Sequence, residues 1–545
     1  MTCGRPVPVE REGKISSVGK RWSVGTGAVA ALITLAAHGA GAQDPERAVI
    51  GVIEVVANEV FEEPVGGVTA QYRVANKVHV RTRDRVVLRE LLFDTGDAVD
   101  QELIEQTERN LRKLPFLRDA RVETIPVDED LDGHVDRVDI RVTTWDRWSL
   151  LPRIGVKQVQ DRTNWEIGAS ETNLFGLGKA VSVSHRTTLD RTIDQVVYED
   201  PQVAGSTIGL IASLANLSDG DEQFFLLDRG YLSLQDTWAV GVAGGSFSRT
   251  DPLFEDGVET GRLRHRGQWG ALEIGRAVRR GAGYAIRLHG AYRVREERVG
   301  SDRRDFGIVE IGLRSISHRF VRLTHVNQFE RTEDFNLGAE SYGSVGVSAP
   351  AFGGSETQVV FLGGGHARGI RFRDDHFLLG RVGFRGRHED GEWRNALTDV
   401  GVRYLRKHTL RNALVGKVEY RHGHNLDPEV QLLLGAATGL RGYPVRQFAG
   451  NRSLLLSIEE RWFFADDVGQ LLSLGAAAFI DSGFVWSESE EVDLADLKTG
   501  VGVSLLIGSN RLSSRGGVRL DLGYGLSPIS GSARWVFAAG SDLKF

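Results

Sequence analysis

The sequence contains very little cysteine and methionine. Among its 545 residues there is one of each, Cys3 and Met1, and both lie at the extreme amino terminus. If that terminus is removed during export, the mature chain holds no thiol. Disulfide bonds, nucleophilic cysteine chemistry and thiolate metal sites are then excluded.

Long apolar runs and prolines are also scarce. No segment after residue 42 reaches about 18 consecutive apolar residues, which excludes helices that cross a membrane. The chain has 13 prolines but 66 glycines. This balance is typical of many antiparallel strands joined by tight turns.

The first 42 residues have the layout of a secretory signal peptide. They begin with five basic residues, Arg5, Arg11, Lys14, Lys20 and Arg21. A weakly apolar run at 23–37 follows, and the small residues of 40–42 suit cleavage. That run is too short to span a bilayer about 30 Å thick, so we expect cleavage after Ala42 rather than an anchor. The net charge of −6 becomes more negative without this basic start, which argues against a nucleic-acid binder.

Residues 43–147 have the pattern of one small mixed domain of order β-α-α-β-β. Asp100 is placed to cap the second helix and Pro115 to end it. The expected elements are a strand at 48–56, helices at 82–93 and 101–114, and strands at 119–127 and 134–144.

From residue 148 to residue 545 the helical pattern disappears and alternating segments recur. At 516–526 the apolar Leu520 and Leu522 oppose Arg519 and Asp521, and at 471–486 the same alternation places Asp481 on the polar face. A soluble antiparallel sheet with one wet face also fits this pattern. We favour an outer-membrane barrel, because the chain has an export signal, aromatic residues near strand ends, and a length beyond a single sandwich.

Six short motifs follow one another in order along the chain. They are LLFDTGDAVDQELIEQTERNLRKLPFLRDARVE at 91–123, NLFGLG at 173–178, YEDPQVAG at 198–205, GLRGYP at 439–444, GNRSLLLSIEERWF at 450–463 and AAFIDSGFVW at 477–486. Together they resemble the POTRA-plus-barrel superfamily of bacterial surface antigen type, which includes the BamA and TamA assembly factors and the two-partner-secretion transporters. The resemblance implies an α+β POTRA domain at 43–147, followed at 148–545 by a transmembrane antiparallel β-barrel of 16 strands. Only one POTRA domain fits before the barrel, fewer than these relatives carry.

The GLRGYP motif is the candidate functional site. Its residues are Gly439, Leu440, Arg441, Gly442 and Tyr443, followed by Pro444. In the superfamily, this motif lies on a long loop that folds back into the barrel, where its arginine pairs with acidic groups on the inner wall. The resemblance implies Asp481 as the partner of Arg441 and Glu459 as a second candidate. A solvated arginine in a glycine-rich turn is the alternative.

The end of the chain carries a second motif implied by the resemblance. Gly540, Leu543 and Phe545 are similar to the C-terminal signal that barrel-assembly machinery reads.

The acidic stretch at 128–139 is the one metal-like pattern. Asp128, Asp130 and Asp132 precede Gly133 in the spacing of a calcium loop. Strands rather than helices flank it, and the twelfth position holds the shorter Asp139. We interpret it as a solvated hairpin turn and expect no metal or cofactor. Nothing in the sequence predicts an enzyme, since neither a nucleophile elbow nor an H-E-x-x-H motif occurs.

These patterns lead to one functional expectation with one alternative. The expected protein lies in the outer membrane of a Gram-negative bacterium, in contact with its lipid, with the POTRA domain in the periplasm. It would insert or translocate unfolded outer-membrane or secreted client proteins, which the POTRA domain captures by β-augmentation, and it could also meet periplasmic partners there. The alternative is a passive channel or structural barrel without a protein client.

Overall fold

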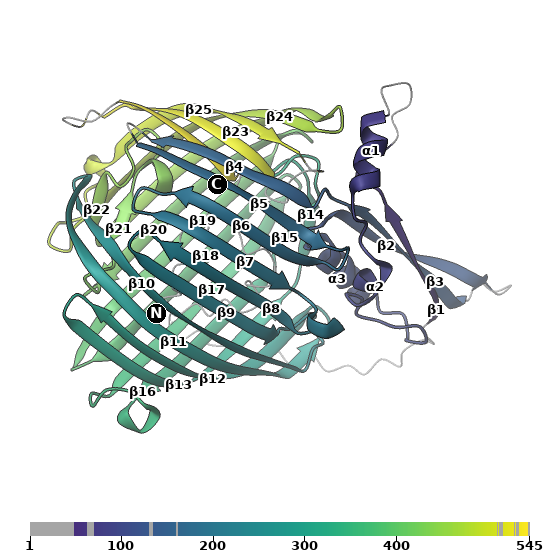
Figure 1. The fold of residues 1–545 in the computed structure, drawn as a ribbon, viewed down its shortest axis with the longest axis horizontal. Coiled ribbons are helices and arrows are strands. Elements are labelled where there is room, and N and C mark those ends of the chain that lie inside the picture. Colours follow the sequence, from purple (N-terminus) through teal and green to yellow (C-terminus); the bar gives the residue numbers. More distant parts are fainter. Residues whose placement is uncertain are drawn as a thin grey trace.

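The computed structural model describes residues 48–62, 70–129, 135–159, 162–509, 511, 516–527, 529 and 534–542. A small α+β domain and a large barrel lie end to end (Figure 1). The expected signal peptide, 1–42, falls outside the described residues. None of the helices in these ranges is long and apolar enough to cross a membrane.

The small domain is a three-stranded sheet covered by short helices. Its strands run in the order β1-β3-β2, with β1 parallel to β3 and β2 antiparallel to it. Asp100 caps α3 by accepting a hydrogen bond from the Glu102 amide at 2.9 Å. Ile104 and Leu111 of α3 are buried against Ile140 of the sheet. The elements are β1 (Val49–Asn58), α1 (Ala70–Val78), α2 (Asp84–Leu88), α3 (Gln101–Arg112), β2 (Leu117–Glu129) and β3 (Val135–Asp146).

One helix of this domain was not predicted from the sequence, and another is shorter than expected. The helix α1 lies between β1 and α2, in a segment that showed no helical stripe. Its apolar Val74 and Val78 are exposed, and its packed face carries Tyr72 and Asn76, so it lacks the buried apolar stripe by which a helix is recognised. The expected helix at 82–93 is reduced to α2, Asp84–Leu88.

The barrel is one antiparallel sheet whose order of neighbours closes on itself. In sequence its strands are β4 (Leu150–Val159), β5 (Arg162–Leu174), β6 (Lys179–Thr187), β7 (Thr192–Asp200), β8 (Gly209–Leu217), β9 (Gly220–Arg229), β10 (Trp238–Glu255), β11 (Val258–Gly281), β12 (Tyr284–Val299), β13 (Asp302–Ser317), β16 (Ala339–Ser348), β17 (Val359–Arg373), β18 (His376–Glu389), β19 (Glu392–Lys407), β20 (Asn412–His424), β23 (Arg452–Val468), β24 (Leu472–Trp486), β25 (Lys498–Gly508), β26 (Gly516–Gly525) and β27 (Trp535–Asp542).

The expected number of 16 strands is wrong, because the described residues of this sheet form twenty. Very short reversals explain the difference. Asp256-Gly257 and Asp390-Gly391 have positive φ angles of 48°, 77°, 52° and 83°, as two-residue hairpin turns require. Such turns use little chain, so the same length holds more strands than the resemblance implied.

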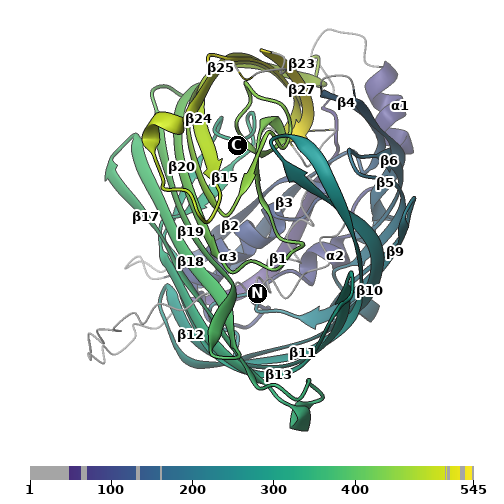
Figure 2. The same cartoon turned by 90° about the vertical axis from the view of Figure 1, so that its left-hand side faces the viewer.

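The barrel strands place apolar side chains outside and charged side chains inside. On β26, Val518 and Leu522 are exposed whereas Arg519 is buried. On β24, Ile480 is 43% exposed and the adjacent Asp481 is 0% exposed. This is the reverse of a soluble protein and the pattern of a barrel surrounded by apolar solvent. Figure 2 looks along the barrel, with the small domain behind it.

Two long insertions interrupt the series of barrel strands, one at each end. The inner hairpin, residues 318–338, follows β13 at the end next to the small domain, which we call the domain end. It contains β14 (Phe320–Leu323) and β15 (Glu333–Asn336). The inward loop, residues 425–451, follows β20 at the far end and contains β21 (Leu432–Leu434), η3 (Ala436–Thr438) and β22 (Phe448–Gly450). The remaining 3-10 turns are η1 (Val203–Gly205), η2 (Pro350–Phe352) and η4 (Leu494–Asp496).

Candidate functional site

The inward loop is packed against the inner wall of the barrel. Its Leu440 and Tyr443 are buried, and they join an apolar cluster with Leu455 of β23 and Val485 of β24. The Tyr443 hydroxyl donates to the Thr499 carbonyl oxygen at 2.9 Å. These contacts fix the tip of the loop, which carries the GLRGYP motif, deep within the sheet's inner face.

Two glycines of the motif are required by geometry. Gly439 has a φ of 109°, a conformation that side chains rarely adopt. A Cβ on Gly442 would lie 2.8 Å from the Gly500 Cα and 3.0 Å from the Tyr524 carbonyl oxygen. The loop backbone therefore lies directly on the backbones of β25 and β26, which holds Arg441 at the wall.

Arg441 contacts both acidic residues that the resemblance suggested. Its Nε and Nη2 donate to Asp481 Oδ2 and Oδ1, each at 2.7 Å, which is a bidentate pair. Its Nη1 donates to Glu459. The guanidinium also lies 3.5 Å from the centre of the Phe479 ring. Arg441 is 4% exposed and both carboxylates are 0% exposed, so this is a buried ion cluster rather than a solvated turn.

Glu459 is the centre of this cluster. Beside Arg441, it accepts from Arg461 Nε at 2.6 Å and from the two terminal nitrogens of Arg519 at 2.8 and 2.7 Å. One buried carboxylate thus faces three arginines, from the inward loop, β23 and β26. We call Glu459, Asp481, Arg441, Arg461 and Arg519 the glutamate cluster.

The outer parts of the inward loop are fixed by ion pairs around the far end. Arg446 donates to both carboxylate oxygens of Asp190, at 2.5 and 2.6 Å. Asp427 accepts two bonds of 2.7 Å from Arg387 of β18. Glu429 accepts from Arg304 of β13 at 2.7 Å. The loop therefore reaches across the barrel opening rather than lying along one wall.

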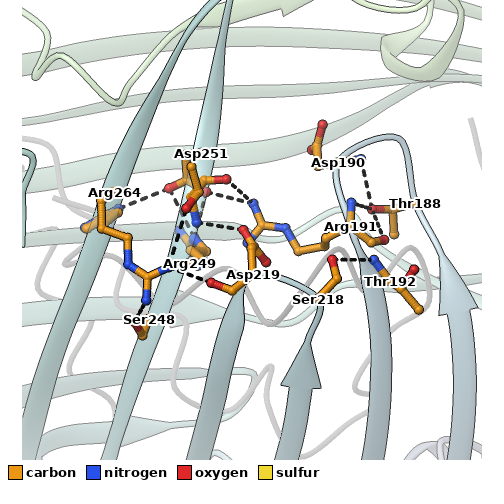
Figure 3. A network of polar contacts seen from close by, with 12 residues as sticks. Thr188, Asp190, Arg191, Thr192, Ser218, Asp219, Ser248, Arg249, Asp251 and Arg264 are labelled. Atoms are coloured by element: carbon orange, nitrogen blue, oxygen red, sulfur yellow. Dashed lines mark hydrogen bonds and ion pairs between the residues drawn. The ribbon is translucent and has the colours of Figure 1, made fainter.

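The Asp190 anchor belongs to a larger polar network at the far end (Figure 3). The neighbouring Arg191 pairs with Asp219 at 3.4 Å and with Asp251 at 3.1 Å. Asp251 also accepts from Arg249 at 2.9 Å. The network joins the β6–β7 turn and the β8–β9 turn to β10, next to the residue that Arg446 of the loop contacts.

The inner hairpin approaches the glutamate cluster from the opposite end. Arg461 Nη1 donates to the Val326 carbonyl oxygen at 2.5 Å, and Arg403 of β19 donates to Asn327 Oδ1 at 2.6 Å. Phe329 packs edge-on against Phe463 of β23, with ring centres 5.2 Å apart. Arg461 therefore contacts both Glu459 and the hairpin, so a continuous series of contacts joins the two insertions.

The same hairpin is attached to α3 of the small domain. Arg112 donates to Asp334 Oδ1 at 2.8 Å and Oδ2 at 2.9 Å. Arg322 pairs with Glu108 at 2.8 Å, and Arg109 lies 4.4 Å above the Phe320 ring. Burial lowers the pKa of Arg112, but the hydrogen bond and charge of Asp334 outweigh burial, so that the pKa is raised.

We expect Asp334→Asn to loosen the attachment of the small domain. The substitution removes one of the two carboxylates that Arg112 faces and leaves Glu108, at a cost of about 1–3 kcal/mol. Amide hydrogen exchange of α3 should become faster in the full-length protein. Asp374→Asn is the matched control, because its fully exposed carboxylate lies in another turn at the domain end. Equal exchange in the two variants would show that the pair does not hold α3.

The other residues singled out in the sequence fall at the limits of the described structure. Asp128 lies at the end of β2, and its backbone pairs with Arg137 of the antiparallel β3, so strands flank the calcium-like pattern. Asp130 and Asp132 lie outside the described residues. The described ranges contain no group of three or more His, Cys, Asp or Glu side chains that could hold a metal. Gly540 pairs with Arg519 across β26 and β27, while Leu543 and Phe545 lie outside the described residues.

Sequence reasoning missed the roles of Arg461, Arg519 and the inner hairpin. Alternation places Arg519 on the polar face, but it gives no distance across the barrel. The hairpin carried one usable signal, since 318–338 is a long polar connection that contains three phenylalanines.

No protein-family model matches the chain. Among curated proteins, it is similar to the outer membrane protein assembly factor BamA of Nitratidesulfovibrio vulgaris, with 23% identity over 512 residues that cover 88% of this chain and 53% of that one. The resemblance to the POTRA-plus-barrel superfamily is confirmed. BamA of Neisseria meningitidis serogroup B is 25% identical over 143 residues, which are 25% of this chain and 17% of that protein.

Solved structures also align with the chain. CdiB from Escherichia coli has 13% identity and a TM-score of 0.45, with 91% of this chain and 77% of that chain covered. BamA from Haemophilus ducreyi lacking POTRA domains 1-3 has 11% identity and a TM-score of 0.37, covering 90% of this chain and 84% of that one. The chain spans about half the length of the first of its curated BamA relatives.

Proposed function

We propose that this chain is an outer-membrane protein that inserts or translocates client proteins. The outward apolar face of the barrel would lie in lipid, where every strand backbone must be paired with a neighbour. The small domain, residues 43–147 in our proposal, would be a POTRA domain in the periplasm, and 148–545 the membrane-spanning barrel. The relatedness to proteins named assembly factors supports this proposal.

The small domain has two sheet edges that a client could extend. In the described residues, β1 and β2 are the outer strands of the order β1-β3-β2. An unfolded client that adds a strand to either edge gains backbone hydrogen bonds without needing a specific side-chain sequence. Because the inner hairpin attaches α3 to the barrel, a captured client would be held next to the domain end. No enzymatic step is needed, since folding of the client provides the driving force.

The glutamate cluster is the observation that carries the proposal. A passive barrel has no need of a small domain attached to its mouth, and the cluster that holds the inward loop is joined to that domain through Arg461 and the inner hairpin. We propose that Arg441 and its motif lock the inward loop in the lumen, with Asp481 and Glu459 as its partners. A buried ion pair adds little net free energy to folding, because its charges lose their hydration. It does favour one position of the loop over others, because only one geometry satisfies both partners.

Depletion of the protein in its own organism tests the proposed function. We expect the abundance of at least one other outer-membrane or secreted protein to fall severalfold, as measured by quantitative proteomics of the membrane and secreted fractions. Re-expression of the intact chain should restore it. If no client changes while the purified barrel conducts ions steadily, the protein is a passive channel and the proposal is wrong.

A further inference from the structure

The segment between β1 and α2 attaches α1 to the rim of the barrel. The Tyr72 hydroxyl donates to the Gly469 carbonyl oxygen at 2.6 Å. The Glu62 amide and carbonyl oxygen form a pair of 2.8 Å hydrogen bonds with the Gln470 side chain. Arg511 donates to the Val60 carbonyl oxygen at 2.6 Å. These contacts hold the segment on the domain-end turns that follow β23 and β25.

One face of α1 packs on its own segment and the other is exposed. The Tyr72 ring lies tilted against the Phe61 ring, with centres 5.5 Å apart, and the Asn76 side chain forms hydrogen bonds with the Phe61 backbone. The opposite face carries Val74 and Val78, which are 62% and 67% exposed, and the exposed Arg73 and Lys77 beside them. Each pair is four residues apart, so the helix has an apolar ridge next to a basic ridge.

The rim that holds α1 is the end of the barrel's outward apolar face. On β24 that face runs from Ile480 to Leu472 at the rim, and Leu472 is exposed. Val468 and Leu471, on either side of the turn that receives Tyr72, are exposed too. Figure 1 shows α1 beyond the domain end of the barrel, and Figure 2, which looks along the barrel, shows it outside the ring of strands, near β4. A bilayer around the barrel would therefore meet α1 at its surface.

We propose that α1 is an interfacial helix that binds the headgroups of anionic phospholipids in the inner leaflet. This inference rests on the proposed placement of the barrel in a membrane. Val74 and Val78 would enter the boundary between headgroups and acyl chains, while Arg73 and Lys77 reach the phosphates. Basic groups near an anionic surface each add to the attraction, and two within one turn of each other reinforce it. The helix would fix the height and orientation of the small domain relative to the bilayer.

Fluorescence quenching in nanodiscs tests this inference on the full-length mature chain. Because that chain is expected to lack cysteine, Val78→Cys accepts a single environment-sensitive fluorophore. The discs contain phosphatidylcholine with phosphatidylglycerol, plus a lipid with a nitroxide near its headgroup, and a second set carries the nitroxide on the acyl chain to probe position 480. We expect strong quenching at position 78, and a roughly threefold loss of quenching when Arg73→Gln and Lys77→Gln are added.

Two further labels separate the possible outcomes. Ile480→Cys reports on the barrel's outer face, and Val127→Cys on an exposed strand of the small domain that points away from the barrel (Figure 1). Quenching at 480 without quenching at 78 overturns the helix proposal and leaves the proposed function standing. Absence of quenching at 480 means that the barrel is not in the bilayer, which overturns both. Quenching at 78 that survives both charge substitutions, or that is matched at 127, rules out recognition of anionic headgroups by α1.

Discussion

Glu459→Gln is expected to destabilise the folded barrel more than any other single substitution in the cluster. The carboxylate is completely buried and accepts hydrogen bonds from Arg441, Arg461 and Arg519. Glutamine retains the shape but provides no negative charge, so three guanidinium groups in one buried site would share only the charges of Asp481 and Asp521. Breaking a buried pair in this way costs about 3–5 kcal/mol.

The measurement is the urea midpoint for unfolding of the refolded barrel in detergent. Unfolding is monitored by the difference in gel mobility between the folded and the heat-unfolded protein. Glu296→Gln is the matched control, because that glutamate is exposed on the outer side of β12 and bonds to Gln268. The control should change stability by less than about 0.5 kcal/mol. Equal midpoints for the two variants would show that the cluster contributes no more than a surface pair does.

The position of the cluster on the inner wall followed from the sequence, but its contacts did not. Period-two alternation places Asp481 and Arg519 on the polar face of their strands, and the structure buries both there. Alternation says nothing about which strands face one another across a barrel. The meeting of Glu459 with Arg519 depends on the register and curvature of β23 to β26, which are set by the whole sheet.

Local sequence signals also predicted only part of the small domain. Asp100 was correctly placed as the cap of α3 because an N-cap depends on only a few neighbouring residues. The helix α1 escaped notice because it packs on Phe61 of its own segment and on Gly469, which lies about four hundred residues further along the chain. The strand number was wrong for a related reason, since it depends on every turn together rather than on any one segment.

Arg441→Ala should release the inward loop while leaving the barrel assembled. Glu459 keeps Arg461 and Arg519, and Asp481 keeps the Ser457 hydroxyl, so the wall retains most of its pairing. The loop loses its bidentate anchor and its contact with the Phe479 ring. An opening cost lowered by about 1.4–3 kcal/mol raises the population of the open loop roughly 10- to 100-fold.

Chymotrypsin cleavage after Leu440 or Phe448 reports that population, because both side chains are buried while the loop is closed. Arg446→Ala is the informative comparison, since it removes an ion pair of the same loop at the rim, where the two side chains are 15% and 20% exposed against 4% and 0% for Arg441 and Asp481. Arg441→Lys should fall between the two, because an ammonium keeps the charge but cannot span both oxygens of Asp481.

If Arg441→Ala and Arg446→Ala were cleaved equally fast, the loop would be held by its ion pairs at the rim. A selective effect of Arg441 would instead place the lock at the glutamate cluster, where the inner hairpin also makes contact through Arg461. Movement of the small domain would then reach the inward loop through the inner hairpin, Arg461 and Glu459, which are already in contact.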